Sequence, residues 1–323
     1  MRRALFLAER GRGTTSPNPI VGAVVVSDDD IVVGQGAHRF AGGPHAEVIA
    51  IESAGALARG ATLYCTLEPC SHTGRTGPCC ERVVAAGISR VVIAAGDPNP
   101  QVNGRGIAYL QSHGVRVEMA APRDRETAVH QNAAFITWVT TNRPHVTLKA
   151  AISRDGFAGY RDRPSKLTGI NTDRFMHRQR AEVGAIAVGA NTILVDDPLL
   201  TARLVFREMP LTRVIFDRRG RVPADARVFG TLDHGPVTVA NGELTDELET
   251  LAKRGITSVL VEGGPSLHRA FWDAGVVDRV QIIETPVTLG TGVEAFRPPA
   301  PAHATTRRIG DDLLSEWDVH RTD

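Results

Sequence analysis

The chain has 323 residues, and a length of about 150 residues per domain predicts two domains. Its 42% hydrophobic and 23% charged residues are typical of a globular protein and argue against disorder or a collagen-like fibre. Lys and Arg number 37 against 36 Asp and Glu, so the chain lacks the basic excess of a dedicated nucleic-acid or membrane-surface binder.

The N-terminal segment MRRALFLAERGRG starts basic and then apolar, like a signal peptide. Its apolar stretch is short, Glu9 interrupts it, and no small-residue cleavage site follows. No apolar run approaches the roughly 20 residues of a membrane-spanning helix. We therefore expect a short amphipathic helix here, no membrane association and a cytoplasmic location.

The first half of the chain alternates strands with helices. A hairpin is predicted from Ile20–Val26 and Ile31–Val33, which a turn at Ser27–Asp30 separates. The further predicted elements are, in chain order, a helix over His45–Leu57, a strand at Thr62–Cys65, a helix over Glu81–Ala86, a strand at Arg90–Ala94, a helix over Gly106–Ser112, a strand at Val115–Glu118 and one long helix over Arg123–Thr140. This alternation predicts an α/β domain with helices on both faces of its sheet.

The segment Thr141–Pro144 is the expected joint, because proline disfavours a helical conformation in the residue before it. We expect one domain over residues 1–143 and another over 144–323. The second half repeats the alternation. Its predicted strands are His145–Ile152, Gly184–Val188, Arg213–Phe216, Val237–Ala240, Ser258–Val261 and Arg279–Glu284, and its predicted helices are Thr172–Ala181, Asp246–Arg254 and Ser266–Ala274.

All four cysteines fall within 16 residues of the first half, at Cys65, Cys70, Cys79 and Cys80. Clustering of this kind in a chain with no disulfide framework indicates metal or catalytic chemistry. Together with His45, two thiolates suit Zn²⁺ and leave a fourth position for water. We prefer Cys79 to Cys80 as a ligand because it follows Pro78 at a predicted helix start. Cys65 and Cys80 are then ordinary core residues.

Glu47 gives the predicted zinc site its catalytic character. It follows His45 by two residues, and both side chains can converge on a metal where a helix start points at it. Glu47 would then be the acid and base of a hydrolytic deamination, as in the H-x-E…P-C-x-x-C zinc deaminases. The eight residues between Cys70 and Cys79 depart from that spacing. The alternative, a structural zinc knot or unrelated buried cysteines, gives Glu47 no role.

Four stretches of the first half resemble the bifunctional deaminase/reductase family of riboflavin biosynthesis: Thr14–Val24, Gly43–Val48, Thr66–Cys79 and Asp97–Pro100. A long Cys-to-Cys loop is usual in that family. The resemblance implies a cytidine-deaminase-like three-layer α/β domain followed by a dihydrofolate-reductase-like α/β domain. It also implies deaminase substrate contacts from Asn18, His38, Arg75 and Asn99. Without it, Asn18 and Asn99 are equally well interpreted as turn residues before proline. His72 is interpreted as a polar loop residue.

Three stretches of the second half carry chemistry. The strand Ser258–Val261 runs into Glu262–Ser266 and a helix start, which can cradle a phosphate or serve only as a turn. The stretch Gly189–Arg203 contains paired carboxylates, Asp196 and Asp197, which suit a metal, a ribose, a helix cap or a turn before Pro198. The third stretch is Leu148–Gly156, a strand that ends in a turn.

In this order and spacing, the three stretches resemble the reductase domain of the same family. The resemblance implies NADPH contacts from Ala151, Thr192, Asp196, Gly264, Pro265, Ser266, Leu267, His268, Arg269 and Ala270. It implies substrate contacts from Ser165, Arg180, Leu200, Arg203 and Glu262. Arg180 and Arg203 would hold a phosphate between them, as bidentate donors do. Glu262 and Asp155 are candidates for handling a proton. The segment around Leu167 stands where the family often has Trp.

The resemblance implies two reactions and two cofactors, one Zn²⁺ per chain and NADPH. The first reaction is zinc-dependent deamination of 2,5-diamino-6-ribosylamino-4(3H)-pyrimidinone 5′-phosphate. The second is reduction of the ribosyl group of 5-amino-6-(5-phosphoribosylamino)uracil to ribityl.

The expected partners are phosphorylated pyrimidine ribonucleotides rather than nucleic acid or membrane, and homo-oligomer formation stays open. One alternative is a cytidine-type deaminase with an inactive reductase-like domain. Another is a zinc-stabilised RNA-binding protein, against which the balanced charge argues.

Overall fold

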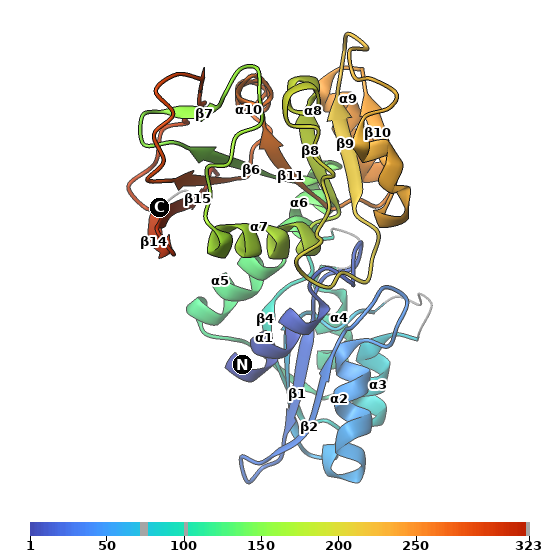
Figure 1. Cartoon of the computed structure of the whole chain (residues 1–323). Helices are drawn as coiled ribbons and strands as arrows, with labels where there is room; N and C mark the ends of the chain where they lie inside the picture. Colours follow the sequence, from blue (N-terminus) through green and yellow to red (C-terminus); the bar gives the residue numbers. More distant parts are fainter. Residues whose placement is uncertain (72–76, 100–102, 321–323) are drawn as a thin grey trace. The chain divides into compact units, whose positions relative to one another are not determined.

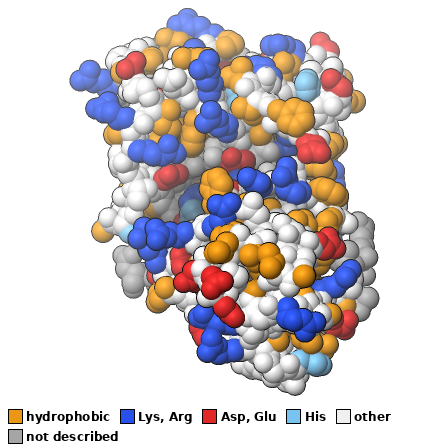
Figure 2. Space-filling model, turned by 90° about the horizontal axis from the view of Figure 1, so that it is seen from below, with side chains coloured by type: hydrophobic (Ala, Val, Ile, Leu, Met, Phe, Trp, Pro, Cys, Tyr) orange, Lys and Arg blue, Asp and Glu red, His pale blue; other side chains and the backbone are white. Residues whose placement is uncertain are grey.

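The structure is a computed structural model of the whole chain, and it describes residues 1–71, 77–99 and 103–320. The chain folds into two compact units, Met1–Asn142 and Arg143–Asp323. The predicted joint at Thr141–Pro144 spans the boundary between them. Within the described ranges, no helix is long and apolar enough to cross a membrane. Figure 2 shows one face of the molecule, on which basic side chains lie among acidic and hydrophobic ones.

The first unit is built on a five-stranded sheet with the order β2-β1-β3-β4-β5. Its strands are β1 (Gly22–Val26), β2 (Val32–Ala37), β3 (Thr62–Leu67), β4 (Arg90–Ala95) and β5 (Arg116–Met119). The predicted hairpin is confirmed, because β1 runs antiparallel to β2 and the Ser27 amide donates to the Ile31 carbonyl at 2.9 Å. Strand β1 is also antiparallel to β3, whereas β3, β4 and β5 are parallel.

Helices cover both faces of this sheet, as predicted (Figure 1). Helices α1 (Arg2–Ala8) and α5 (Pro122–Gln131) lie on one face, and α2 (Ala46–Ala54), α3 (Cys79–Ala85) and α4 (Arg105–Ser112) lie on the other. Short 3₁₀ turns, η1 (Glu9–Gly11) and η2 (Gly55–Ala58), follow α1 and α2. Helix α2 rests directly on β2, because a Cβ atom at Gly36 would lie 2.2 Å from the Ala46 carbonyl oxygen. This close approach fixes the start of α2, which carries His45 and Glu47.

The long helix predicted over Arg123–Thr140 is wrong. Two helices, α5 and α6 (Ala133–Thr141), occupy this stretch, and they are separated at Asn132, whose φ and ψ are −104° and 16°. The Asn132 side chain is buried, accepts a hydrogen bond from the Ile20 amide at 2.9 Å and donates to the Ile20 carbonyl at 3.0 Å. These two bonds hold the chain before β1 and interrupt the helix.

The second unit is built on an eight-stranded sheet with the order β10-β9-β8-β11-β6-β12-β15-β14. Its strands are β6 (His145–Ile152), β8 (Ala185–Gly189), β9 (Thr212–Phe216), β10 (Val237–Ala240), β11 (Ser258–Gly263), β12 (Arg279–Glu284), β14 (Thr305–Ile309) and β15 (Asp312–Asp318). The six predicted strands are confirmed and run parallel, whereas β15 and β14 are antiparallel additions that were not predicted. A small ribbon of β7 (Phe157–Gly159) and β13 (Val293–Glu294) lies apart from the sheet.

The helices of this unit include the three that were predicted. They are α7 (Ile170–Glu182), α8 (Ala190–Asp196), α9 (Leu244–Lys253) and α10 (Pro265–Asp273), with a 3₁₀ segment, η3 (Arg227–His234). Because parallel strands end at the same edge of a sheet, the segments that follow β6, β8, β9 and β11 gather there. This edge is where an α/β sheet binds ligands, and it carries all three chemical stretches predicted for this half.

Candidate active sites

His45, Cys70 and Cys79 come together in the first unit. His45 is the residue before α2, Cys70 follows β3, and Cys79 is the first residue of α3. His45 Nδ1 lies 3.1 Å from Cys79 Sγ and 3.6 Å from Cys70 Sγ. Among the residues that the structure describes, these three form the sole cluster of His, Cys, Asp or Glu that could hold a metal ion. Zn–N and Zn–S bonds of about 2.0 and 2.3 Å fit donor atoms at this spacing, so the residues present suit tetrahedral Zn²⁺ with one open position.

The neighbouring cysteines lie outside this cluster. Cys80 and Cys65 are buried in the hydrophobic core of the unit, and the Cys80 amide donates to the Cys70 carbonyl at 3.1 Å. Hydrogen bonding to Cys79 and the neighbouring His45 lower the pKa of Cys70 to about 4, against the effect of burial. His72 and Arg75 lie outside the described residues.

Glu47 lies in the first turn of α2, buried behind the zinc ligands with 3% of its surface exposed. Burial raises its pKa to about 7. A carboxyl group with a pKa near the working pH can both take up and release a proton. The acid–base role of Glu47 stays a prediction, which its burial in the turn directly after His45 supports.

Asn18 and His38 form a second polar group beside the zinc ligands. The rings of His38 and His45 meet edge to face, with their centroids 5.4 Å apart. His38 Nδ1 lies 3.1 Å from the Pro44 carbonyl oxygen and can only donate to it, so Nε2 accepts from Asn18 Nδ2 at 3.1 Å. Burial lowers the pKa of His38, which keeps the ring neutral and this arrangement stable at pH 7. Asn99 lies in a turn in which its amide donates to Asp97 Oδ1 at 2.8 Å.

Glu68 is a residue whose importance sequence reasoning missed. Its carboxylate is 3% exposed and accepts hydrogen bonds from the amides of Gly104, Gly106 and Ile107 at 3.0, 2.9 and 3.2 Å. It thereby ties the chain just before Cys70 to the start of α4. The Glu68-Pro69-Cys70 sequence contained the residue, but its partners at the start of α4 lie 36 to 39 positions away.

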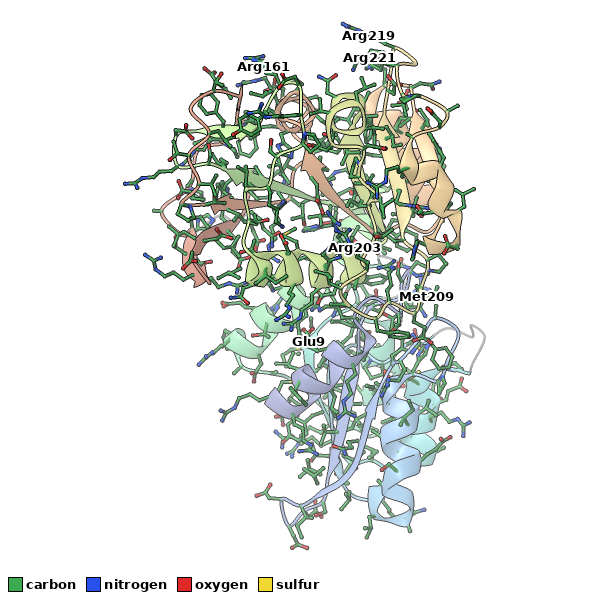
Figure 3. All side chains as sticks on the ribbon, viewed as in Figure 1. Glu9, Arg161, Arg203, Met209, Arg219 and Arg221 are labelled. Carbon is green, nitrogen blue, oxygen red and sulfur yellow. The ribbon has the colours of Figure 1, made fainter. Side chains whose placement is uncertain are left out.

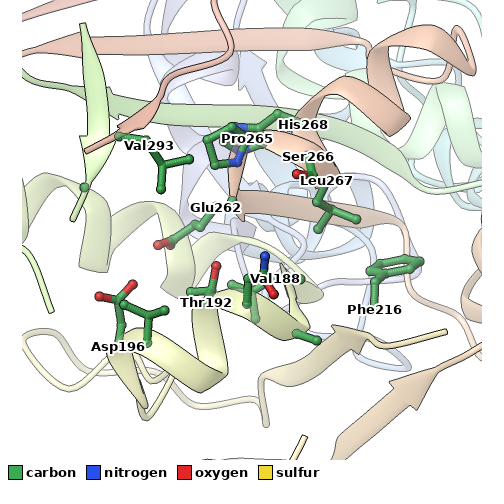
Figure 4. Close-up of a pocket in the computed structure, with 18 of the residues that line it drawn as sticks. Val188, Thr192, Asp196, Phe216, Glu262, Pro265, Ser266, Leu267, His268 and Val293 are labelled. Carbon is green, nitrogen blue, oxygen red and sulfur yellow. The ribbon is translucent and has the colours of Figure 1, made fainter. Parts of the chain in front are cut away.

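The second unit contains a cavity of about 990 Å³ at the carboxyl edge of its parallel strands (Figure 4). Every residue predicted to contact NADPH lines it except Arg269, whose guanidinium lies 4.8 Å from the centre of the Phe296 ring. The cavity floor is the turn from β11 into α10, where Gly263 has a φ of +132° that favours glycine. Thr192 of α8 faces this turn, since a Cβ atom at Gly264 would lie 3.7 Å from its Oγ1. The turn, the helix start and α8 together fit a dinucleotide phosphate.

The residues predicted to contact the reductase substrate line this cavity and an adjoining one. Ser165, Arg180, Leu200 and Glu262 line the larger cavity. Arg203 lines a second, polar cavity of about 430 Å³, which shares Arg180 and Glu262 with the first. All five residues therefore lie around two adjoining cavities that share Arg180 and Glu262.

Arg180 already makes three hydrogen bonds within the protein. Its Nε and Nη2 donate to Glu262 at 2.6 and 2.7 Å, and its Nη1 donates to the Thr201 carbonyl at 2.9 Å. Both Arg180 and Arg203 line the smaller cavity, and their pairing around a phosphate stays a prediction in which Glu262 already neutralises part of the charge.

The two carboxyl groups considered for proton handling are both ionised at neutral pH. Burial alone would raise the pKa of Glu262, but the charge and hydrogen bonds of Arg180 outweigh it and hold the pKa at about 2. Hydrogen bonds from Ser153 Oγ and from the amides of Leu289 and Gly290 lower the pKa of Asp155 to about 2. Asp155 also lines neither cavity. Neither group therefore holds a proton to donate.

Lys149, in β6, is a second residue to which sequence reasoning gave no role. It lines both cavities, and burial lowers its pKa. The chain has only three lysines among its 37 basic residues, and Lys149 and Lys166 both line these cavities. An ammonium group can lose its proton near neutral pH when buried, whereas a guanidinium cannot. The rarity of Lys in this Arg-rich chain is the feature of the sequence that could have indicated a special role for Lys149.

The fold and these sites define the class of protein: a zinc-dependent deaminase joined in one chain to a reductase. Residues 1–95 match the cytidine and deoxycytidylate deaminase zinc-binding region, and residues 144–313 match the RibD C-terminal domain. The chain belongs to the RibD family of riboflavin biosynthesis proteins, as the resemblance predicted. The predicted fold class and the two predicted cofactors, zinc and NADPH, agree with this membership.

Known proteins resemble the chain over nearly all of its length. It is 39% identical to riboflavin biosynthesis protein RibD of Aquifex aeolicus, over 91% of this chain and 88% of that protein. It is 38% identical to RibD of Escherichia coli, over 90% and 88%. A solved diaminohydroxyphosphoribosylaminopyrimidine deaminase/5-amino-6-(5-phosphoribosylamino)uracil reductase from Thermotoga maritima superposes with a TM-score of 0.87 at 36% identity, covering 98% of this chain and 96% of that one. Acinetobacter baumannii RibD superposes with a TM-score of 0.85 at 34% identity, with the same coverage.

Proposed function

We propose that the chain catalyses two successive reactions on one phosphorylated pyrimidine ribonucleotide, with residues 1–143 as the deaminase domain and 144–323 as the reductase domain. The first reaction removes the amino group of 2,5-diamino-6-ribosylamino-4(3H)-pyrimidinone 5′-phosphate. The second reduces the ribosyl group of the product to ribityl. The observation that carries the proposal is that one chain contains both a His45–Cys70–Cys79 cluster that could hold a metal ion, with a buried Glu47 beside it, and a cavity lined by nearly all the residues predicted to contact NADPH.

In the deaminase domain, His45, Cys70 and Cys79 would hold Zn²⁺, which supplies an activated water for attack on the ring carbon that bears the amino group. Glu47 takes one proton onto its carboxylate and returns it to the amino nitrogen, which leaves as ammonia. Asn18 forms hydrogen bonds with a polar edge of the substrate, and His38 Nε2 fixes the orientation of the Asn18 amide by accepting a hydrogen bond from its Nδ2.

In the reductase domain, the turn after β11 and the side chains of α8 would hold NADPH, which supplies the hydride for C1′ of the sugar. Arg203 binds the substrate phosphate from the smaller cavity. Glu262, held by Arg180, accepts hydrogen bonds from the substrate at a fixed position. Lys149 delivers the proton that balances the reduction, because neither Glu262 nor Asp155 carries one.

All four cysteines are free, and both this and the use of NADPH favour the cytoplasm, where thiols stay reduced.

The proposed function is tested by incubating the protein with the diaminopyrimidinone ribonucleotide, with and without NADPH. Ammonia release without NADPH, and one NADPH oxidised per ammonia when it is present, are expected. Ammonia release with no NADPH oxidation would contradict the reductase step and favour a single-function deaminase.

A further inference from the structure

An arginine-rich loop follows β9 at one end of the larger cavity. Arg218, Arg219 and Arg221 all line the cavity, and all three are exposed. Figure 3 shows Arg219 and Arg221 close together at the tip of the loop, well apart from Arg161, which also lines the cavity but lies near β7. The residues predicted to contact NADPH include none of these arginines.

The backbone of this loop is fixed by a buried carboxylate. Asp217 is 3% exposed, accepts a hydrogen bond from the Val222 amide at 2.8 Å and a longer one from the Arg219 amide at 3.4 Å. Its own amide donates to the Ala240 carbonyl at 2.8 Å, which ties the loop to the end of β10. Gly220, with a φ of +61°, allows the chain to reverse between Arg219 and Arg221. The backbone positions from which the Arg219 and Arg221 side chains extend are therefore fixed by this turn.

The three arginines differ in how their charge is compensated. Arg218 pairs with Glu243 at 2.5 Å and donates to the Gly242 carbonyl. Arg221 Nη1 donates to Asn191 Oδ1 at 2.7 Å, and this neutral amide orients the side chain without cancelling its charge. Within the described part of the chain, the Arg219 guanidinium has no hydrogen-bond or ion-pair partner. Arg219 and Arg221 thus present two uncompensated cations at the cavity rim.

The order of the strands places these cations on the opposite side of the turn after β11 from β6, so a dinucleotide bound at this turn with its nicotinamide towards β6 would have its adenosine end at these cations. The phosphate-binding turn follows β11, and β8 and then β9 lie next to it on one side, whereas β6 with Ala151 lies on the other. Neighbouring strands are about 4.8 Å apart, so the end of β9 is roughly 10 Å from the turn. One ribose and the reach of an Arg side chain span that distance. Figure 4 shows Phe216, the last residue of β9, on the side of Leu267 and Val188, away from Val293 and Asp196.

We propose that Arg219 and Arg221 bind the 2′-phosphate of NADPH and thereby select NADPH over NADH. This inference rests on the reductase function proposed above. A phosphate monoester between two guanidinium groups accepts several charge-assisted hydrogen bonds. NADH has a hydroxyl group at this position and would leave both cations without an anionic partner. Arg218 contributes less, because Glu243 already neutralises it.

The experiment measures binding of two probes to the full chain by titration calorimetry: 2′,5′-ADP, which has the 2′-phosphate, and 5′-AMP, which lacks it. The wild-type protein binds 2′,5′-ADP more tightly. Arg219→Ala weakens 2′,5′-ADP binding about 10-fold or more, and the double variant with Arg221→Ala removes the preference, while 5′-AMP binding stays within about 2-fold. Arg219→Lys, which keeps the charge without the planar fork, retains part of the preference.

Two control variants separate this contact from general electrostatics. Arg161→Ala removes another cavity-lining arginine, and Arg308→Ala removes an exposed one on β14; both leave the ratio of the two affinities unchanged. A preference for 2′,5′-ADP that survives in the double variant, or equal weakening of both probes, would overturn the inference and leave the reductase function intact. A wild-type protein that binds neither NADPH nor 2′,5′-ADP would overturn both.

Discussion

The two sites of this chain hold their charged groups in different ways. In the first unit, His45, Cys70 and Cys79 place their donor atoms within 4.8 Å of one another, at a spacing that suits a bound metal ion. In the second unit, Arg180 and Glu262 neutralise each other before any ligand is bound. The deaminase site therefore depends on its metal for integrity, whereas the reductase site depends on an internal ion pair.

The largest effect is expected from loss of a zinc ligand. Cys79→Ser removes one of the two thiolates, so the protein should lose stoichiometric zinc and its deamination should fall to background, while NADPH oxidation with the deaminated substrate persists. Zinc content by mass spectrometry and both activities are measured on the same sample. Cys80→Ala is the matched control and should keep its zinc; loss of zinc in that variant instead would mean that Cys80 is the ligand.

A change at Glu47 separates metal binding from catalysis. Glu47→Gln keeps the shape of the side chain but cannot take up the proton, so deamination should slow about 1000-fold with zinc content unchanged. Glu52→Gln, an exposed position on the same helix, should leave the rate at the wild-type value. Deamination by the Glu47 variant at more than a tenth of the wild-type rate would show that another group moves the proton.

The ion pair of the second unit should act through stability as well as binding. Glu262→Gln leaves the buried Arg180 cation without its partner and should lower the free energy of unfolding of this unit by about 3 kcal/mol. Urea unfolding at pH 7 measures the change. Glu284→Gln is the control, because its pairing with Arg297 is exposed and should contribute less than about 1 kcal/mol.

The same pair has a defined pH dependence. The pKa of Glu262 is about 2 in the folded chain, below the value of about 4.3 expected when unfolded. Its contribution is therefore fully present above the unfolded pKa and is lost as the pH falls towards 2. The stability difference between wild type and Glu262→Gln should shrink over that window, and a difference that stayed constant down to pH 2 would show that the ion pair is not its source.

The smallest effect is expected at Glu68, which organises the first unit without touching the metal. Glu68→Gln removes the charge that accepts amide hydrogen bonds at the start of α4, and it should lower the unfolding free energy of this unit by about 2 kcal/mol. Zinc content should not change. Glu81→Gln, exposed on α3, should shift the urea midpoint very little; an equal shift in both variants would count against the role of Glu68.

Local patterns predicted most of the fold and the first site. Short stretches of sequence were enough to predict the strands on either side of Ser27–Asp30 and the strand His145–Ile152. The clustered cysteines, together with His45 and Glu47, were likewise enough to predict the zinc site. The break at Asn132 could not be predicted, because it depends on Ile20, which lies 112 positions away. Glu262 meets Arg180 across 82 positions for the same reason. The zinc site is encoded in short motifs, whereas the reductase site exists only once the strand order is set.

The central claim, that one chain contains two independent active sites, is tested most directly by mixing two variants. Glu47→Gln should fail in deamination only, and Arg203→Ala, which removes the proposed phosphate contact, should fail in reduction only. Given the diaminopyrimidinone ribonucleotide, neither variant alone should oxidise NADPH at an appreciable rate, because Glu47→Gln forms no deaminated product and Arg203→Ala forms this product but does not reduce it. Their equimolar mixture should restore NADPH oxidation, with one NADPH consumed per ammonia released. A mixture as inactive as its two components would contradict the account.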